Sequence, residues 1–412
     1  MITQKKIKIC FVLPVPLLPL KGASFTCFRQ AMALDRLGFS VSILSPKIRD
    51  KESVSALNSG HIKIMDWLPD RASRNYFGHL KTLAFSWPFI AAAIMKEKPD
   101  ILHVHNPTDI IPMVVSLINR FAGIPFVFQM NDPGPESILS IIGLKSPKKE
   151  IMLMSAKIME NIVMGHAAGF TTVNDVLRKK IIATRKNLSL KPFITYYNIA
   201  DLPDESIVNP SIEEDDYILY VGTLSSEFLG LESLIYSYRQ IWEKYGTKLF
   251  VIGDGPLLEK LKRAVESLHA SAYIRLPGYV SPEAIPTYLK HARLCIIPYL
   301  DTILTRVATP TKLFEYLSYG KVVVCPDFPG FTEILGTGNP GLYRSAVSGD
   351  ILRVIGDMLR NNELRTKTES MNRTLSLNYT FDKEMMKILT LYGEVCAGVE
   401  ARNQITALIK EN

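Results

Sequence analysis

Short apolar runs alternate with amphipathic stretches along the whole chain. In the first half the apolar runs predict strands and the amphipathic stretches predict helices: strands at 7–13, 40–44, 101–104, 126–129 and 169–173, and helices at 25–37, 110–122 and 151–166. The second half restarts the pattern, with predicted strands at 217–221, 248–252, 273–276, 294–297 and 322–325. Strands that alternate with helices in this way predict the α/β class, with doubly wound parallel sheets.

A polar stretch at 198–216, which ends in an acidic run, interrupts this alternation and predicts a linker. A chain of 412 residues also exceeds the usual size of one hydrophobic core. We therefore predict a Rossmann-like domain at 1–198, a linker at 199–216, a second Rossmann-like domain at 217–380 and a C-terminal helical segment at 381–412.

The N-terminal region imitates a signal peptide, because three lysines precede the apolar run 9–20. Three prolines interrupt that run and no clear cleavage site follows it, so the pattern predicts a first strand and a loop. Elsewhere no uncharged apolar run reaches the length of about 18 residues that a membrane-spanning helix needs. The sequence therefore predicts a soluble or peripheral protein.

The formal net charge is +8, and the lysines and arginines are dispersed. Because no basic stripe carries interleaved aromatic residues, nucleic acid is not predicted as a partner, and an acidic membrane surface fits the charge better. The five cysteines are scattered and have no zinc-like spacing, which is typical of buried, reduced thiols in a cytoplasmic protein.

The run from Thr309 to Cys325 predicts a short helix that leads into a buried strand. Thr309 suits the N-cap, Pro310 the first helical position and Gly320 the C-terminal exit. The positive charge of Lys312 in the first turn opposes the helix dipole. Its position becomes favourable if an anion such as a phosphate binds there. Glu315 then lies one turn further on, close to whatever carries the phosphate. The alternative is that both charged side chains are merely exposed.

Two further candidates follow predicted strands of the first half. Gly22 comes after the first strand and before the first helix, at a position where α/β proteins bind ligands, although any such turn favours glycine. His103 and His105 alternate along the strand that ends at His105 and therefore face the same side. A zinc pair is one interpretation, but no third ligand has zinc-like spacing. Histidines buried in the core are another.

Three glycine turns follow predicted strands of the second half: Gly222-Thr223, Gly253-Asp254-Gly255 and Gly278-Tyr279-Val280. At Gly253 a strand enters a tight glycine turn and then a helix, which suits contact with a phosphate or a ribose. The Gly253 turn also suggests a dinucleotide-dependent oxidoreductase. That alternative is disfavoured because Leu258 occupies the third glycine position and no acidic residue closes the following strand.

These segments together resemble the retaining glycosyltransferases of group 1 (family 4), which have the GT-B fold, and the resemblance covers nearly the whole chain. Glu315 matches the glutamate that holds the donor's ribose in that family, and Gly320 matches the glycine that follows it. In one subgroup Lys312 and Tyr316 are also in register. The turns at Gly222 and Gly253 and the segment 101–109 match further family motifs.

The resemblance implies a nucleotide diphosphate sugar as donor and a lipid-linked or surface glycan as acceptor, reached from the cytosolic face of a membrane. It places His105 beside the transferred sugar, Lys312 at the diphosphate and Glu315 at the ribose. Further donor contacts are implied for Gly22, Gly222, Thr223, Gly253, Asp254, Tyr279, Val280, Thr309 and Thr311, and acceptor contacts for Asn131, Asp132 and Glu136. It also implies a last helix that crosses back to the first domain. No cofactor is implied, and no metal, since the chain lacks an Asp-x-Asp triplet.

The chain departs from the family pattern at several polar positions. Val307 replaces the first glutamate of the usual pair, and Pro310 supplies no N–H between the two. Thr223 and an apolar residue near Leu229 stand where an arginine and a lysine normally neutralise the diphosphate. Two alternatives to transfer therefore stay open: a catalytically degenerate GT-B binding protein, and a sugar-nucleotide 2-epimerase of the same fold.

Overall fold

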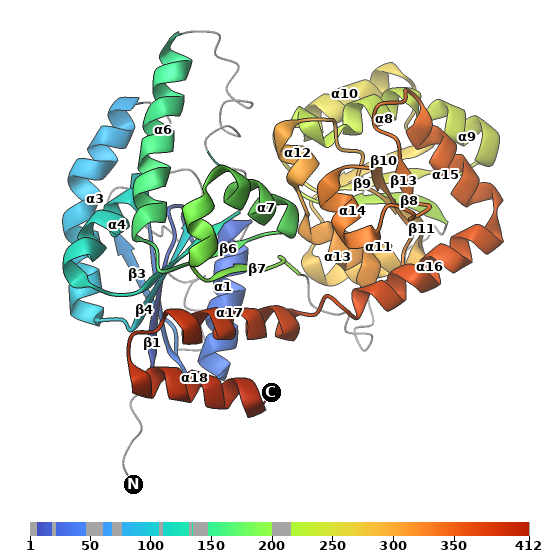
Figure 1. Cartoon of the computed structure of the whole chain (residues 1–412). Helices are drawn as coiled ribbons and strands as arrows, with labels where there is room; N and C mark the ends of the chain where they lie inside the picture. Colours follow the sequence, from blue (N-terminus) through green and yellow to red (C-terminus); the bar gives the residue numbers. More distant parts are fainter. Residues whose placement is uncertain are drawn as a thin grey trace. The chain divides into compact units, whose positions relative to one another are not determined.

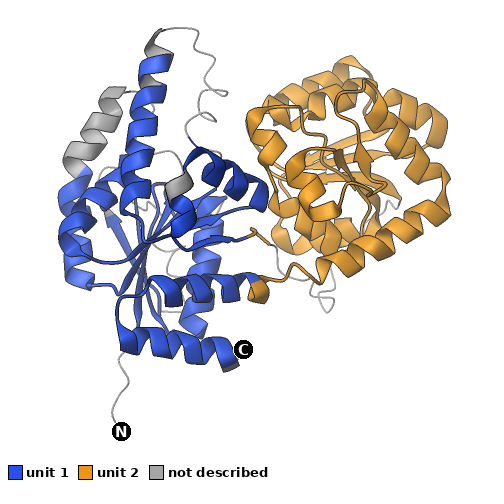
Figure 2. Cartoon of the chain, in the orientation of Figure 1, with its two compact units in different colours: residues 1–196, 384–412 blue, residues 197–383 orange. Residues whose placement is uncertain are grey.

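The computed structural model describes residues 6–18, 22–46, 61–67, 76–106, 110–131, 134, 147–199 and 216–411. The chain divides into two compact units (Figure 2). Unit 1 comprises residues 1–196 and 384–412, and unit 2 comprises residues 197–383. The C-terminal end of the chain thus belongs to the same unit as the N-terminal half.

Unit 1 contains a seven-stranded parallel sheet in the order β3-β2-β1-β4-β5-β6-β7. Its strands are β1 (Lys8–Val12), β2 (Ser40–Pro46), β3 (Lys63–Trp67), β4 (Ile101–Asn106), β5 (Phe126–Met130), β6 (Gly169–Thr172) and β7 (Phe193–Thr195). Its helices are α1 (Ala23–Arg36), α3 (Tyr76–Glu97), α4 (Ile110–Ala122), α6 (Pro147–His166), α7 (Asp175–Thr184), α17 (Phe381–Val395, in unit 1 from Glu384) and α18 (Val399–Glu411).

The strand order of unit 1 reverses between β1 and β4. The connection through α1 runs from β1 to β2, whereas those through α4 and α6 run the other way across the sheet. Because parallel crossovers are right-handed, α3, α4 and α6 cover one face and α1 the other (Figure 1). The carboxyl ends of β1 and β4 flank the reversal, where open α/β sheets bind ligands.

Unit 2 repeats this plan with a six-stranded parallel sheet in the order β10-β9-β8-β11-β12-β13. Its strands are β8 (Tyr217–Val221), β9 (Leu249–Ile252), β10 (Ile274–Gly278), β11 (Ala292–Ile296), β12 (Val323–Pro326) and β13 (Leu342–Tyr343). Its helices are α8 (Leu231–Ser237), α9 (Arg239–Tyr245), α10 (Leu258–Ser267), α11 (Ile285–His291), α12 (Ile303–Val307), α13 (Thr311–Ser318), α14 (Pro329–Leu335), α15 (Asp350–Arg360) and α16 (Asn362–Ser376). The strand order reverses between β8 and β11.

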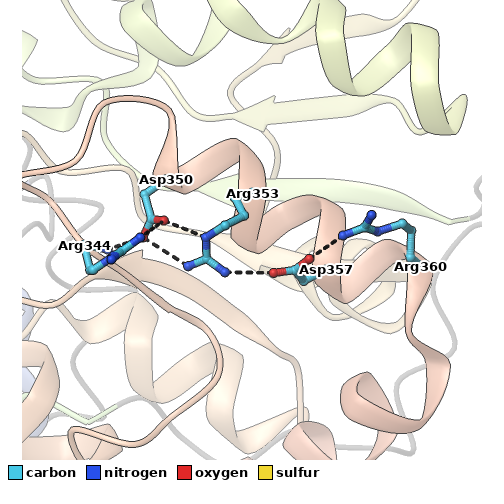
Figure 3. A network of polar contacts seen from close by, with 5 residues as sticks. All are labelled: Arg344, Asp350, Arg353, Asp357 and Arg360. Carbon is cyan, nitrogen blue, oxygen red and sulfur yellow. Dashed lines mark hydrogen bonds and ion pairs between the residues drawn. The ribbon is translucent and has the colours of Figure 1, made fainter.

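Helix α15 carries a chain of ion pairs along one side (Figure 3). The buried Asp350 accepts hydrogen bonds from the Arg344 backbone N–H at 2.7 Å and from Arg353 Nε at 2.6 Å. Arg353 also donates to Asp357, which in turn pairs with Arg360. Arg353 and Arg344 hold the pKa of Asp350 well below its usual range. Since both carboxylates are neutralised, we interpret this network as support for the helix.

The structure confirms the fold class and corrects some details of the elements. The strands β3, β7 and β13, which the sequence analysis did not predict, lie at or next to the edges of the two sheets. Helix α13 begins at Thr311 with Pro310 as its N-cap, so the predicted N-cap Thr309 is wrong. Pro310 has extended backbone angles, and Thr309 is buried, with its hydroxyl donating to the Gly330 carbonyl at 3.4 Å.

Candidate functional site

The first part of the candidate site lies where β1 and β4 end in unit 1. Gly22 precedes α1 and has a φ of +50°, in the left-handed region that favours glycine. Its carbonyl accepts the hydrogen bond from Thr26 N–H that opens the helix. His105 is the last but one residue of β4, which pairs with β1 in the sheet. Gly22 thus follows β1 and His105 lies at the carboxyl end of β4, the two strands that flank the reversal of strand order.

His103 fits the interpretation of a core histidine whose polar atoms are satisfied. Its Nδ1 lies 2.6 Å from Tyr392 Oη of α17, and its Nε2 lies 3.0 Å from Gln129 Oε1 of β5. Because Gln129 Oε1 accepts, Nε2 carries the proton and Nδ1 accepts from the tyrosine hydroxyl. Burial lowers the pKa of His103 to about 3, so the ring is neutral.

His105 does not fit that interpretation. Its ring is fully buried and stacks on His103 at 5.0 Å between ring centroids, yet neither nitrogen has a hydrogen-bond partner in the described structure. Burial, and then the neighbouring His103, lower its pKa well below 6.5. A neutral imidazole always presents one donor and one acceptor, so this side chain has unused hydrogen-bonding capacity.

The predicted acceptor-side residues follow β5. Asn131 Oδ1 accepts a hydrogen bond from Gln129 Nε2 at 3.1 Å, which joins it to the His103 network. Asp132 and Glu136 lie outside the described residues. Of the three acceptor-side calls, the structure thus places only Asn131, at the carboxyl edge of the sheet.

The second part of the candidate site is built from glycine turns after β8, β9 and β10 in unit 2. Gly222 N–H donates to the Ile252 carbonyl at 3.0 Å, and Gly253 N–H donates to the Gly278 carbonyl at 2.8 Å. Gly222 and Gly253 have φ values of +151° and +145°. A Cβ on Gly253 would lie 1.9 Å from the Gly222 carbonyl oxygen. Glycine is therefore required for the turns to approach each other.

Lys312 of α13 reaches over the Gly222 turn. Its Nζ donates to Tyr220 Oη at 2.6 Å and lies 3.9 Å from the centroid of the same ring and 5.9 Å from that of Tyr299. The residue is half-buried, and its ammonium lies against the rings of Tyr220 and Tyr299. Burial lowers the pKa of Lys312 to about 7, against the opposing effect of the Glu315 carboxylate. The sequence interpretation of a merely solvated lysine is thus wrong.

Helix α13 is fixed to β8 one turn beyond Lys312. The buried Tyr316 accepts a hydrogen bond from Val221 N–H at 2.8 Å. Glu315 is half-buried on the same helix. The structure therefore brings Gly222, Lys312 and Glu315 together at the carboxyl end of β8, next to the reversal of strand order.

The remaining predicted donor contacts differ in exposure. Thr223, Asp254 and Tyr279 are exposed on the three turns, Val280 and Thr311 are half-buried, and Thr309 is buried. Asp254 Oδ1 accepts a hydrogen bond from Gly255 N–H at 2.7 Å and so shapes its own turn. A second cation near this end of the sheet, Arg306 of α12, pairs with Asp301 at 2.7 Å. Lys312 is thus the better placed of the two cations.

Sequence reasoning missed Tyr220, Tyr299, Gln129 and Tyr392 as parts of these two clusters. Tyr220 sits inside the apolar run of β8, and Tyr299 follows β11. Their hydroxyls gave the only signal, since a buried tyrosine usually needs a hydrogen-bond partner. Tyr392 and His103 are 289 residues apart, and no local pattern links them.

We expect Gly222→Ala to weaken nucleotide binding as well as stability. The added Cβ would lie 2.4 Å from Lys312 Nζ and displace it, and alanine at a φ of +151° is strained by about 1–3 kcal/mol. Denaturant unfolding and calorimetric titration measure the two effects. Gly246→Ala is the matched control, because its φ is +64° and its Cβ would meet nothing within 4 Å. Equal nucleotide affinity in both variants would show that Gly222 is not part of the binding site.

Two searches of the described residues bear on alternative functions. No cluster of three or more His, Cys, Asp or Glu side chains that could hold a metal ion occurs among them. None of the helices in this part of the chain is long and apolar enough to cross a membrane. All five cysteines are buried free thiols.

Comparison with protein families identifies the class. The family described as glycosyl transferases group 1 matches residues 203–374, and the one described as a glycosyl transferase 4-like domain matches residues 21–186. Together the two matches cover most of the chain. It belongs to the group 1 glycosyltransferases and has the GT-B fold.

Individual relatives are distant. A 2-deoxystreptamine N-acetyl-D-glucosaminyltransferase from Niallia circulans is 26% identical over 82 residues, which are 20% of this chain and 21% of that protein. Sucrose-phosphate synthase from Thermosynechococcus elongatus has a TM-score of 0.69 at 13% identity, covering 93% of this chain and 98% of its own. HepE from Anabaena, solved in complex with UDP, has a TM-score of 0.65 at 14% identity, covering 98% and 100%. These structural likenesses establish the fold, and the family matches support glycosyltransferase function.

Proposed function

We propose that this chain is a retaining glycosyltransferase that moves a sugar from a nucleotide diphosphate sugar to a glycan acceptor without a metal ion. In the reaction the bond between the anomeric carbon and the diphosphate breaks, and a bond to an acceptor hydroxyl oxygen forms. The proton of the acceptor hydroxyl passes to the departing nucleoside diphosphate or to water. The chain lacks an Asp-x-Asp triplet, which favours the metal-independent form of this chemistry.

The observation that carries the proposal is the cluster at the carboxyl end of β8. There the Lys312 ammonium, the first turn of α13 and the Gly222 turn converge at the reversal of the sheet. Backbone N–H groups at a helix start, a nearby cation and a turn without a side chain together suit a diphosphate. Lys312 stabilises the charge that develops on the departing diphosphate, and Glu315 accepts hydrogen bonds from the ribose hydroxyls.

The sugar is positioned from unit 1. Among the described residues neither nitrogen of His105 has a hydrogen-bond partner, so one can bond a sugar hydroxyl, and Gly22 allows close approach to the start of α1. Thr223, Gly253, Asp254, Tyr279, Val280, Thr309 and Thr311 complete the donor side. For the acceptor side the proposal assigns contacts to Asn131, Asp132 and Glu136. The residues that we assign to the sugar belong to unit 1, and those that we assign to the diphosphate and the ribose belong to unit 2.

The acceptor in this proposal is a lipid-linked or surface glycan at the cytosolic face of a membrane, with the enzyme in the cytoplasm or bound to that face. The excess of positive charge on the chain supports an anionic surface as a partner. No nucleic acid and no cofactor are part of the proposal.

One other function is supported by specific features of the sequence, and a second is disfavoured. Val307, Thr223 and Leu229 replace polar residues of the family pattern, which favours a degenerate protein that binds a partner without catalysis. A 2-epimerase on the same fold would release an altered sugar nucleotide and need no acceptor. It would need acid and base carboxylates at the sugar, whereas the histidine predicted beside the sugar is neutral.

Thermal-shift measurements with a panel of UDP-, GDP-, ADP- and dTDP-sugars test donor binding. At a hundredfold excess over Kd, the cognate donor should stabilise the protein by about 2.7 kcal/mol and raise Tm measurably, also in EDTA. The same donor should give a smaller shift with Lys312→Met. If no member of the panel shifts Tm, the transferase proposal fails and the degenerate binding protein replaces it.

We expect Glu315→Ala to weaken nucleotide binding by about 1.5–3 kcal/mol, the usual contribution of a hydrogen bond to a charged group. The fold should be intact, because Tyr316 anchors α13 independently. Calorimetric titration gives the affinity, and Glu363→Ala, an exposed glutamate on α16, is the control. An unchanged affinity in Glu315→Ala would remove the residue from the site.

A further inference from the structure

The outer surface of α3, α4 and α6 is unusually apolar. Eight of the eighteen large apolar side chains that are exposed in the described structure lie on these three helices. They are Trp87, Phe89 and Met95 of α3, Leu117 and Phe121 of α4, and Ile151, Met154 and Ile158 of α6. We call this set the apolar face. Single exposed apolar residues are normal, but a concentrated patch marks an interaction surface.

The three helices are neighbours, so these side chains belong to one surface. α4 packs against both α3 and α6, and the three lie side by side on one flank of unit 1 (Figure 1). The apolar residues point outward because the opposite sides of the helices, such as Ile90 and Val115, are buried in the core. Phe121 is 91% exposed, which is costly in water unless something covers it.

The charge of the chain is divided unequally between the two units. Unit 1 contains 29 lysines and arginines against 17 aspartates and glutamates, a net +12, whereas unit 2 has 19 against 23, a net −4. Lys96 of α3, Lys98 just after α3 and Arg120 of α4 are exposed and make no ion pair with a described residue. A partner that is complementary to this face therefore has an apolar interior and a negatively charged surface.

We propose that the apolar face docks unit 1 on an anionic phospholipid bilayer, with Trp87 and Phe121 inserted among the acyl chains and the exposed cations at the headgroups. This inference rests on the proposed function, because it supplies the way in which the enzyme reaches a membrane-bound acceptor. A second copy of this chain is disfavoured, since a symmetric contact would bring the same cations together. Interfacial aromatic side chains and flanking lysines suit a bilayer boundary.

Sedimentation with 100-nm vesicles tests the proposal on the full chain. The protein should bind phosphatidylcholine vesicles that contain about a third phosphatidylglycerol, and bind pure phosphatidylcholine much less. Trp87→Ser/Phe121→Ser/Ile158→Ser, one change on each helix, should weaken binding at least tenfold. Lys96→Gln/Arg120→Gln should weaken it by about fivefold for each charge removed. Tyr236→Ser/Val347→Ser/Leu377→Ser is the matched control, with three exposed apolar residues of unit 2, and should bind normally.

Tryptophan fluorescence locates the contact. The emission should shift to the blue on binding and be quenched by brominated acyl chains, and Trp87→Phe should remove most of both effects while it preserves binding. Equal vesicle binding by the apolar-face variant and its control overturns the proposal. A dimer without lipid that the apolar-face variant disperses also overturns it, because it assigns the face to a second copy.

The vesicle test is separable from the proposed function. Thermal shifts with sugar nucleotides should be unchanged in the apolar-face variant, since its three residues lie outside the candidate site. Vesicle binding without any donor-induced shift would leave the docking surface in place and remove the transferase proposal. Donor binding without vesicle binding would leave the transferase proposal in place and overturn the docking surface.

Discussion

Replacement of His105 with phenylalanine is expected to reduce sugar transfer at least about 10³-fold while the protein folds normally and keeps its affinity for the nucleotide. The phenylalanine ring fills about the same volume, and no hydrogen bond among the described residues is lost, because neither nitrogen of His105 has a partner. The free energy of unfolding should therefore change by less than about 1.5 kcal/mol. Incorporation of labelled sugar measures transfer, and calorimetry measures nucleotide affinity.

His103→Phe provides the contrast. This change leaves the buried Tyr392 Oη without its partner, which costs about 1–3 kcal/mol. It also removes one of two donors to Gln129 Oε1, which keeps the hydrogen bond from Gln30 Nε2 at 3.2 Å. We therefore expect His103→Phe to lose stability and His105→Phe to lose activity. Full transfer by a folded His105→Phe enzyme would make His105 a packing residue and withdraw its assignment to the sugar.

Lys312→Met is expected to slow transfer by about 10²-fold or more, the effect of losing one charge-stabilising group at the transition state. The stability of the protein without donor should change little. The change removes an ammonium that opposes the dipole of α13, but it also removes the hydrogen bond to the buried Tyr220 hydroxyl. Steady-state kinetics and denaturant unfolding measure the two effects. Unchanged turnover together with a lower Tm would instead identify a structural lysine.

The pH dependence of donor binding gives a sharper test of the same residue. The pKa of Lys312 is lowered to about 7, so the free protein loses this positive charge as pH rises above 7, and a bound diphosphate draws the proton back. If its pKa in the complex lies above 9, affinity should fall up to about tenfold per pH unit from pH 7 to pH 9. The sugar nucleotide itself does not titrate there, and burial raises the pKa of Tyr220 and Tyr299 above this range. Lys312→Met should bind weakly with little pH dependence.

The sequence predicted the fold class because the alternation of buried strands and helices is a property of the whole chain. The short edge strands β7 and β13 were not predicted, because a strand of two or three residues has no periodic pattern of apolar positions. The C-terminal segment, predicted as one helix, is divided into α17 and α18 by Cys396–Gly398. A glycine in so short a gap gave only a weak sign of a break.

The sequence predicted where the site residues lie in the fold, but it did not predict the side chains that surround them. Glycine turns and His105 at strand ends follow from the general rule for α/β sheets. The enclosure of Lys312 by Tyr220 and Tyr299 was not predictable, because it depends on tertiary contacts of residues 92 and 13 positions away. Period-2 alternation placed both histidines on one face, but only the partners Tyr392 and Gln129 distinguish His103 from His105.

The most direct measurement of the central claim follows both products of one reaction. The enzyme is incubated in EDTA with the sugar nucleotide that shifts its Tm, labelled in the sugar, and with a lipid-linked acceptor fraction. The proposal predicts that nucleoside diphosphate and labelled glycan appear in equal amounts, and that His105→Phe forms neither. Release of an altered sugar nucleotide without nucleoside diphosphate, or binding with no turnover, would contradict it.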